Sequence, residues 1–312
     1  MIIDINSIFS FNQLGNRETQ EDSRYPNNDN PGNDSAAFVV CDGVGGCDKG
    51  EVASSTVCSK IGDMIQNHKN TDKFSCEDLK KIISYAYDSL DHVSNPSNLG
   101  MGTTLTLLVI HSQGVMGAHI GDSRIYQIRP NEGIIYRSED HSLVNALLRS
   151  GNISPEEVKG HPKNNVITRC MSANDGTRNR DNATVINLKD IAPGDYFLLC
   201  TDGVTNMVED EELIEVYSTD KTDEEKINYL SNICKESDDN NTLVQVHIGH
   251  VTVDPEIENN ELEESSINED SSINIVNTQE LKSNFDSIKE LSPSKINYQS
   301  KIKSIFSKIL KF

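Results

Sequence analysis

Four aspartates lie where apolar segments of this sequence begin or end. Asp42 directly follows AAFVVC and Asp202 follows FLLCT, and a glycine comes immediately after each of them. Asp122 lies in the middle of AHIGDSRIY, and Asp239 shortly precedes the run TLVQV. A carboxylate at the end of a rigid strand, beside backbone that glycine leaves accessible, is suited to holding a hard divalent cation. We therefore take Asp42 as the candidate central metal ligand and the other aspartates as its candidate partners.

Each of these aspartates also has a purely structural interpretation, because Asp-Gly and Asp-Ser pairs are common in turns. The number of such acids argues against a coincidence of turn residues, since Glu21 and Asp22 also lie ahead of the first core strand. Neighbouring strand ends of one sheet system can converge in space. Spacing along the chain does not by itself establish that they do.

The segments that would position these acids alternate between two hydrophobic periods. Short β-rich runs separated by turn residues predict strands at 2–12 and 36–41, a meander with tight turns from TTLTLLVI to GIIYRS, and the later strands ATVINL, DYFLLC and NTLVQVHI. Apolar residues at helical spacing predict helices at 51–68, 79–93, 142–160, 209–217 and 223–235. Strand groups that are each followed by helices indicate an α+β domain, in which packed antiparallel sheets lie between outer helices.

Composition narrows the classes of function. The 312 residues carry a formal net charge of −21, which would repel nucleic acid, so no nucleic-acid partner is expected. The seven cysteines are scattered and give no indication of a disulfide framework or a zinc site, which favours a reducing cytosol. The N-terminus does not resemble a signal peptide, and no apolar stretch approaches the roughly 20 residues that span a bilayer. We expect a cytoplasmic, monomeric protein.

The character of the chain changes after residue 254, where the predicted domain 1–254 ends. Residues 255–293 hold ten acids against two lysines and predict a disordered acidic linker. Residues 294–312 carry five lysines and no acid, and Ile302, Ile305, Phe306 and Ile309 share one helical face. This pattern is typical of a basic amphipathic helix. Such a helix could lie on an anionic membrane at the inner surface of the cell, dock on a partner or pack back on its own domain.

Several short motifs occur in the order of a known family and span about residues 10–250. They are Arg17-x-x-x-Glu21-Asp22, Asp42-Gly43-Val44-Gly-Gly, Met-Gly102-Thr103-Thr, Gly-Asp122-Ser-Arg, Thr-Asp202-Gly-Val and Asp239-Asn-Asn-Thr, with a flap-like segment at 140–169. One DGxGG alone would be weak evidence, but the ordered set is specific. The chain resembles the metal-dependent Ser/Thr protein phosphatases, the PPM or type 2C group, in their bacterial form.

The resemblance implies a phosphohydrolase with two Mn²⁺ or Mg²⁺ ions. Asp42 would bridge the ions. Glu21 and the Gly43 carbonyl would complete one site, and Asp202 and Asp239 the other. Asp122 with Asp202 would form a third, looser site.

The resemblance also implies roles in catalysis. Arg17 would bind the phosphate oxygens, Asp22 would orient a water, and Gly102 and Thr103 would support the site. Water would attack phosphorus in line, on phosphoserine or phosphothreonine of a protein, in opposition to a bacterial Ser/Thr kinase. Where many eukaryotic members have histidine, Val44 cannot donate a proton to the leaving group.

Three residues fit parts of these patterns without a catalytic assignment. Asp181 also begins an Asp-Asn-x-Thr motif, but it precedes the TDG strand and is interpreted as a surface turn residue. His141 and His161 lie in the flap-like segment, where structural roles are expected.

Two other functions of the whole chain stay open. One is a catalytically weak protein of this fold that binds phosphorylated partners as a regulator or scaffold. The other is a phosphatase of a small phosphorylated metabolite.

Overall fold

The structure is a computed structural model that describes residues 1–44, 49–94, 100–158, 160–174, 179–252 and 275–277. Internal contacts divide the chain into Met1–Val276 and Asn277–Phe312, and of the second unit only Asn277 is described. The predicted C-terminal helix therefore lies outside the described residues. So does the predicted linker, apart from a three-residue strand, Ile275–Asn277.

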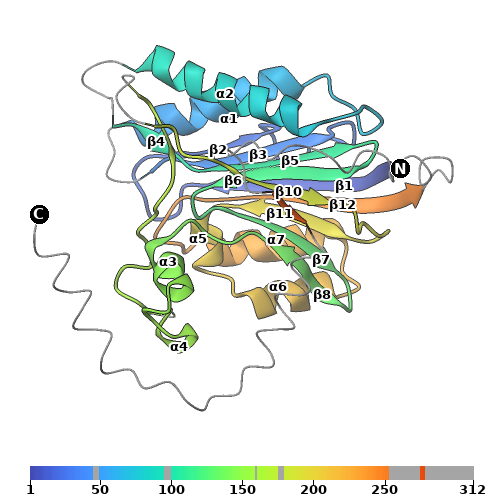
Figure 1. Ribbon diagram of the computed structural model, residues 1–312. Coiled ribbons are helices and arrows are strands. Elements are labelled where there is room, and N and C mark those ends of the chain that lie inside the picture. The colour runs from blue at the N-terminus through green and yellow to red at the C-terminus, as the bar shows by residue number, and fades with distance from the viewer. Residues whose placement is uncertain (45–48, 95–99, 159, 175–178, 253–274, 278–312) are drawn as a thin grey trace, which may run out of the picture. The chain divides into compact units, whose positions relative to one another are not determined.

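Two sheets form the centre of the first unit (Figure 1). The five-stranded sheet has the order β1 (Ile2–Gln13), β12 (Asn241–Thr252), β11 (Tyr196–Cys200), β7 (Arg124–Arg129) and β8 (Gly133–Arg137). The six-stranded sheet has the order β13 (Ile275–Asn277), β10 (Thr184–Leu188), β6 (Gly114–Ile120), β5 (Leu105–His111), β3 (Ala37–Asp42) and β2 (Asp22–Tyr25). A separate two-stranded sheet pairs β4 (Gly102–Thr103) with β9 (Met171–Ser172).

Helices cover the outer faces of both sheets (Figure 1). The six-stranded sheet carries α1 (Gly50–Ile65) and α2 (Cys76–Val93), whose apolar faces pack on β3, β5 and β6. The five-stranded sheet carries α5 (Asp202–Thr205), α6 (Asp210–Tyr217) and α7 (Asp223–Cys234). The flap, residues 140–169, contains α3 (Leu143–Arg149) and α4 (Pro155–Val158). No helix in the described part of the chain is long and apolar enough to cross a membrane.

The apolar run before Asp42 is explained by burial on both faces of β3. Ala37, Val39 and Cys41 pack against α1 and α2, while Phe38 and Val40 alternate with them and are fully buried. Alternate residues of a strand point to opposite faces, so Phe38 and Val40 face the other sheet. A strand between two layers needs a continuous apolar sequence.

The layered α+β architecture confirms the predicted fold class, and most predicted strands and helices are present with small shifts of their ends. The helix predicted at 142–160 is wrong as one element, because the structure has two short helices there, α3 and α4. The predicted meander is wrong at one place. β5 and β6 form a hairpin in the six-stranded sheet, whereas β7 and β8 belong to the five-stranded sheet. The turn at 121–123 is therefore a crossing between sheets. The alternation of apolar residues indicates strands, but it does not show which sheet each strand joins.

A second difference concerns the polar segment before β3. Asp22 begins a short strand, β2, which pairs with β3 so that Asp22 lies opposite Asp42. Only four residues long and polar, β2 has too little apolar alternation to be recognised from its sequence.

The first residue of α7 ties that helix to three strands. The Asp223 carboxylate accepts hydrogen bonds from Ser7 on β1 and from Tyr196 Oη on β11 at 2.6 Å, and it pairs with His247 Nδ1 on β12 at 2.7 Å. Burial acts to raise the pKa of Asp223, but these hydrogen bonds outweigh it and hold the pKa below its ordinary value of 3.8. The ionised carboxylate therefore stabilises the fold.

We expect Asp223→Asn to lower the free energy of unfolding by about 1–3 kcal/mol at pH 7, because it leaves buried donors without their charged acceptor. A depressed native pKa adds stability above the ordinary pKa, and this stability is lost as the pH falls. The difference between wild type and variant should therefore shrink below about pH 4. Urea unfolding followed by circular dichroism, at pH 7 and below about pH 4, measures this difference in the free energy of unfolding. Glu224→Gln removes the same charge from an exposed position in the same turn and should have little effect; an equally large loss there would contradict the assignment.

Candidate active site

A cavity of about 340 Å³ is lined by five of the six acids that the sequence singled out, all but Asp22. Asp42 ends β3, Asp122 lies between β6 and β7, and Asp202 begins α5. Glu21 immediately precedes β2, and Asp239 is separated from β12 by Asn240 alone. Strand ends of both sheets thus meet at one end of the sandwich, beside α5 and β4 (Figure 1). The residues that line the cavity are Arg17, Glu21, Asp42, Gly43, Val44, Thr104, Asp122, Asn165, Ile167, Asp202, Asn206, Asp239 and Asn240.

The backbone of Asp42 is fixed by two threonines. Thr103 Oγ1 donates to the Asp42 carbonyl at 2.8 Å, and the Thr104 N–H donates to the same oxygen at 2.8 Å. The Asp42 N–H donates to Thr104 Oγ1 at 2.9 Å. The next turn is held by the Val44 N–H, which donates to the Gly102 carbonyl at 3.0 Å. Gly102 and Thr103 therefore contact the site through its backbone and do not line the cavity.

Glycine at position 43 is required by close packing. A Cβ on Gly43 would lie 2.6 Å from the carbonyl of Gly50 and 2.9 Å from Cβ of Glu21. Gly50 is the first residue of α1, and a Cβ there would lie 3.1 Å from Glu21 Oε2. The Glu21 carboxylate is thus close to the N-terminus of α1, where the helix dipole favours negative charge.

Asp22 is buried behind the lining of the cavity. Its Oδ2 accepts hydrogen bonds from Thr242 Oγ1 at 2.7 Å and Thr201 Oγ1 at 3.0 Å, while its Oδ1 is buried without a partner. The structure places Asp22 opposite Asp42 in the β2–β3 pair, and its carboxylate faces the five-stranded sheet through the two threonines.

Arg17 and Asp239 lie together at the exposed side of the cavity. Arg17 Nη2 and Asp239 Oδ2 are 2.7 Å apart, and Arg17 Nε donates to the Asp238 carbonyl at 3.0 Å. The buried Asn240 fixes the adjoining backbone, because its Oδ1 accepts the Glu21 N–H at 2.8 Å and its Nδ2 donates to the Leu14 carbonyl at 2.8 Å. The first and last acidic motifs of the sequence therefore share one hydrogen-bonded loop system.

Asp202 lies at the start of α5 and has a close-packed glycine behind it. A Cβ on Gly203 would lie 2.0 Å from the Asn240 carbonyl, so the Asp-Gly pair lets α5 contact the loop that carries Asp239. Oδ2 of Asp202 is 3.4 Å from Asn206 Nδ2, and its Oδ1 is buried without a hydrogen-bond partner.

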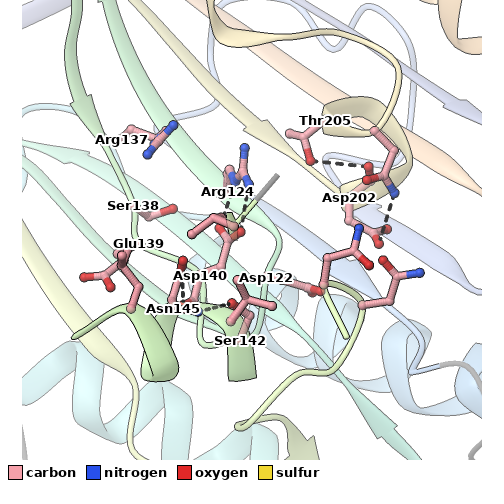
Figure 2. Close-up of a pocket in the computed structure, with 16 residues that line it drawn as sticks. Asp122, Arg124, Arg137, Ser138, Glu139, Asp140, Ser142, Asn145, Asp202 and Thr205 are labelled. Atoms are coloured by element: carbon pink, nitrogen blue, oxygen red, sulfur yellow. Dashed lines mark hydrogen bonds and ion pairs between the residues drawn. The ribbon is translucent and has the colours of Figure 1, made fainter. Parts of the chain in front are cut away.

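Asp122 and Asp202 also line a neighbouring cavity of about 430 Å³, which reaches from the active site to the flap. Figure 2 shows these two aspartates on its wall, with Asp140 of the flap paired to Arg124. Asn165 and Asn206 line both cavities.

Burial and mutual repulsion raise the pKa of the carboxyls at this site. Burial is the main cause at Asp42, followed by the charges of Asp22, Asp202 and Asp122, and the pKa is well above 3.8. Burial is the largest effect on Asp22 and raises its pKa to about 7. Hydrogen bonds from two threonines oppose this rise, and the charges of nearby aspartates add to it. Burial and the charge of Asp202 raise the pKa of Asp122 to about 7. The pKa of Asp202 is raised by burial and by Asp239.

These features fit divalent cations. Asp202 Oδ1 in the lining is a buried acceptor without a donor, the lining offers oxygen ligands, and the raised pKa values mark negative charge that a cation would stabilise. Among the described residues, no three His, Cys, Asp or Glu side chains already form a closed metal-binding group. The acids share a cavity and are spread along its wall.

Asp181 and His161, which the sequence also singled out, do not line this cavity. Asp181 is absent from the described lining, as expected, but it is half-buried and not a surface turn residue: its Oδ2 accepts the Cys170 N–H at 3.0 Å, and its carbonyl accepts Tyr87 Oη at 2.8 Å. His161 Nδ1 accepts the Lys163 N–H at 3.2 Å within the flap.

Sequence reasoning placed four polar residues in the ordered motifs but missed their role, which is to hold the acids. Thr104, Thr201, Asn240 and Thr242 are buried, and each bonds to an acidic residue or to its backbone. The available signal was their position, since Thr201 directly precedes Asp202, Asn240 and Thr242 follow Asp239, and Thr104 directly precedes an apolar strand. Buried polar groups of this kind are rarely left without partners.

We expect Asp42→Asn to raise the melting temperature of the chelator-treated protein at pH 7, by roughly 2–4 °C for each kcal/mol of repulsion removed. A raised native pKa means that ionisation costs stability above the ordinary pKa of 3.8, so the gain should fade as the pH is lowered toward 4. The variant should also lose most of the increase in melting temperature that Mn²⁺ gives the wild type. Calorimetry with chelator and with Mn²⁺ measures both.

Asp238→Asn is the matched control, because this neighbouring carboxylate is exposed and does not line the cavity. It should leave both melting temperatures nearly unchanged. An Asp42→Asn protein that is less stable than wild type in chelator would contradict the electrostatic account.

Comparisons with known proteins bear on this site. The family model described as "Protein phosphatase 2C" matches residues 18–244. Protein phosphatase PhpP of Streptococcus pneumoniae is 34% identical over 185 residues, which is 59% of this chain and 73% of that protein.

Solved structures agree with this match. The crystal structure of the serine/threonine phosphatase Stp1 from Staphylococcus aureus has a TM-score of 0.67 and 29% identity, covering 80% of this chain and 98% of that one. The catalytic domain of the serine/threonine protein phosphatase PstP, in complex with two manganese ions, has a TM-score of 0.65 and 25% identity, covering 80% of this chain and all of that one. The family match spans most of the chain and agrees with the ordered motifs, and the chain therefore belongs to the protein phosphatase 2C family.

Proposed function

We propose that this chain is a metal-dependent protein phosphatase that hydrolyses phosphoserine and phosphothreonine monoesters, in opposition to a Ser/Thr kinase. The observation that carries the proposal is the convergence of Glu21, Asp42, Asp122, Asp202 and Asp239 in one cavity with the guanidinium of Arg17. The name of the Staphylococcus aureus relative, a serine/threonine phosphatase, supports this substrate class.

Five carboxylates divide naturally into ion-binding groups. Asp42 would be shared between two ions, with Glu21 and the Gly43 carbonyl on one side and Asp202 and Asp239 on the other. A further ion would use Asp122 with Asp202. Oxygen ligands suit Mn²⁺ or Mg²⁺ and disfavour zinc. When bound, such ions make an activated water available near neutral pH and offset the charge of the phosphoryl oxygens.

The protein's own groups would bind and orient the substrate. Arg17 is 46% exposed at the cavity and presents planar N–H donors that match two phosphate oxygens. Asp22, fixed by Thr201 and Thr242, would orient a water through Oδ1, its buried oxygen without a partner. Val44 lines the cavity but has no proton to give, so we assign protonation of the leaving alkoxide to water.

Wild-type protein should hydrolyse p-nitrophenyl phosphate and a phosphothreonine peptide in the presence of Mn²⁺, and this hydrolysis should stop when a chelator is added. Asp42→Asn should be inactive. Arg17→Ala should lower kcat/KM by about 10- to 100-fold, because charge-assisted hydrogen bonds to phosphate are lost, while Mn²⁺ binding by titration calorimetry is retained. Arg17→Lys is the matched variant, since it keeps the charge and loses the planar fork, and it should recover only part of the loss.

Two outcomes would contradict the proposal. Wild-type protein that binds phosphopeptide yet is inert with Mn²⁺ across a wide pH range would point to a regulatory or scaffold protein of this fold. Turnover of small phosphomonoesters without turnover of any phosphopeptide would point to a metabolite phosphatase.

We propose further that residues 294–312 dock weakly on an anionic membrane surface. The proposal is supported by the five lysines and the apolar face of that segment, which lies outside the described residues. A variant that ends at residue 293 should keep full turnover of a soluble phosphopeptide but lose co-sedimentation with phosphatidylglycerol vesicles. A full-length variant with Gln at Lys301, Lys303, Lys308 and Lys311 keeps the apolar face and should bind vesicles much less. Equal sedimentation of all three proteins would contradict membrane docking and leave docking on a partner or on the protein's own domain.

A further inference from the structure

The turn that carries Asp122 is held on both sides by two consecutive residues of the flap. After Asp122, the Arg124 guanidinium donates from Nε and Nη2 to the two oxygens of Asp140, both at 2.8 Å (Figure 2). Before Asp122, the Gly121 N–H donates to His141 Nδ1 at 3.1 Å, and the His141 N–H donates to the Gly121 carbonyl at 2.8 Å. His141 thus holds the residue directly before a candidate metal ligand, and Asp140 holds the arginine two positions after it.

The His141 ring is oriented by its surroundings. It is 5% exposed, stacks on His119 with ring centroids 4.6 Å apart, and places Nε2 2.9 Å from Thr184 Oγ1. Burial, with the neighbouring charges of His119 and Arg169, lowers the pKa of His141 to about 3, so the ring is neutral at physiological pH. Because Nδ1 accepts from Gly121, the proton of the neutral ring is on Nε2 and faces Thr184.

The turn itself has little freedom on its other side. Gly121 has a φ of +102°, and a Cβ at that position would lie 2.6 Å from Thr104 Cγ2. Thr104 Oγ1 is 2.7 Å from Ser123 Oγ and accepts the Asp42 N–H. The Asp122 turn therefore lies between His141 and the threonine that fixes Asp42.

His141 is also part of the base of the flap. Its carbonyl accepts the Thr168 N–H at 2.7 Å, and the next residue, Ser142, forms a β-bridge with Ile167. Ile167 and Asn165 line the active-site cavity. A displacement of the flap base would therefore move both the wall of the cavity and the support of Asp122.

We propose that His141 is a positioning residue, which sets the place of Asp122 through Gly121 and couples the flap to the ion that Asp122 would bind. The inference rests on the proposed function, since Asp122 matters to catalysis only through that ion. Outer partners of metal ligands typically contribute 10- to 100-fold to metal affinity. His141 would act less directly, because it contacts the backbone of Gly121 and not the Asp122 side chain.

Two substitutions separate the hydrogen bond from the volume of the ring. His141→Phe keeps a flat ring against His119 but removes the acceptor for Gly121. His141→Asn loses the ring but retains an oxygen the same number of bonds from Cα as Nδ1. His119→Phe is the matched control, because it changes the other member of the stack and leaves both hydrogen bonds to Gly121 in place.

The first measurement does not involve the loaded enzyme. In chelator-treated protein, hydrogen exchange at residues 120–123 should become at least tenfold faster in His141→Phe and stay near the wild-type rate in His141→Asn and His119→Phe. Titration calorimetry with Mn²⁺ should show about 10- to 100-fold weaker binding of the ion that Asp122→Asn also loses, with the other ions unchanged.

The deciding test is a double-mutant cycle on Mn²⁺-dependent turnover of p-nitrophenyl phosphate. His141→Phe should raise the Mn²⁺ concentration for half-maximal activity about tenfold or more in the wild-type background, and it should have no further effect in Asp122→Asn. An equal effect in both backgrounds, or the same effect from His119→Phe, would overturn the coupling. Wild-type turnover with Mn²⁺ tests the proposed function separately, because it does not depend on His141 variants.

Discussion

The structure depends on one electrostatic constraint: several carboxylates are held close together in a partly buried cavity. Their raised pKa values show that the protein environment disfavours their charge, and at Asp42 both burial and neighbouring acids contribute. The fold tolerates this cost because the backbone around the acids is fixed by neutral donors and acceptors. Thr103, Thr104 and Asn240 bind backbone groups beside the acids, so the carboxylates are held without being neutralised. Divalent cations are the group that best relieves such a site.

The sandwich makes this arrangement possible because strand ends from both sheets open at the same place. Asp42 comes from the six-stranded sheet, Asp202 and Asp239 flank strands of the five-stranded sheet, and Asp122 lies on the connection between the two. Close contact between these ends needs glycine at two positions, Gly43 and Gly203, where any side chain would collide with backbone. The two DG pairs of the sequence therefore serve packing at the site as much as turn formation.

The sequence indicated the architecture and the acids, but not how the two are joined. The apolar period was enough for the layers, and the resemblance that the ordered motifs carry implied which acids share a site. The crossing between β6 and β7 was taken for a hairpin because a turn sequence such as GDS suits either connection, and only pairing with β10 or β11 distinguishes them. The role of the supporting residues was missed for a related reason. A threonine such as Thr201 or Thr242 is ordinary in a strand, and its role follows only from the acid that folding brings beside it.

The charge of the cavity also constrains the order in which its ligands bind. Arg17 is the single cation among the described lining residues, and its Nη2 is paired with Asp239. A phosphate dianion would meet a wall of carboxylates, with the one suitable guanidinium engaged by one of them. Cations that bind Glu21, Asp42, Asp202 and Asp239 would change both conditions, since they would offset the repulsion and compete with Arg17 for Asp239. On the proposed function, metal binding would therefore precede productive phosphate binding, and the ions that supply the activated water would also free the Arg17 guanidinium for the phosphate.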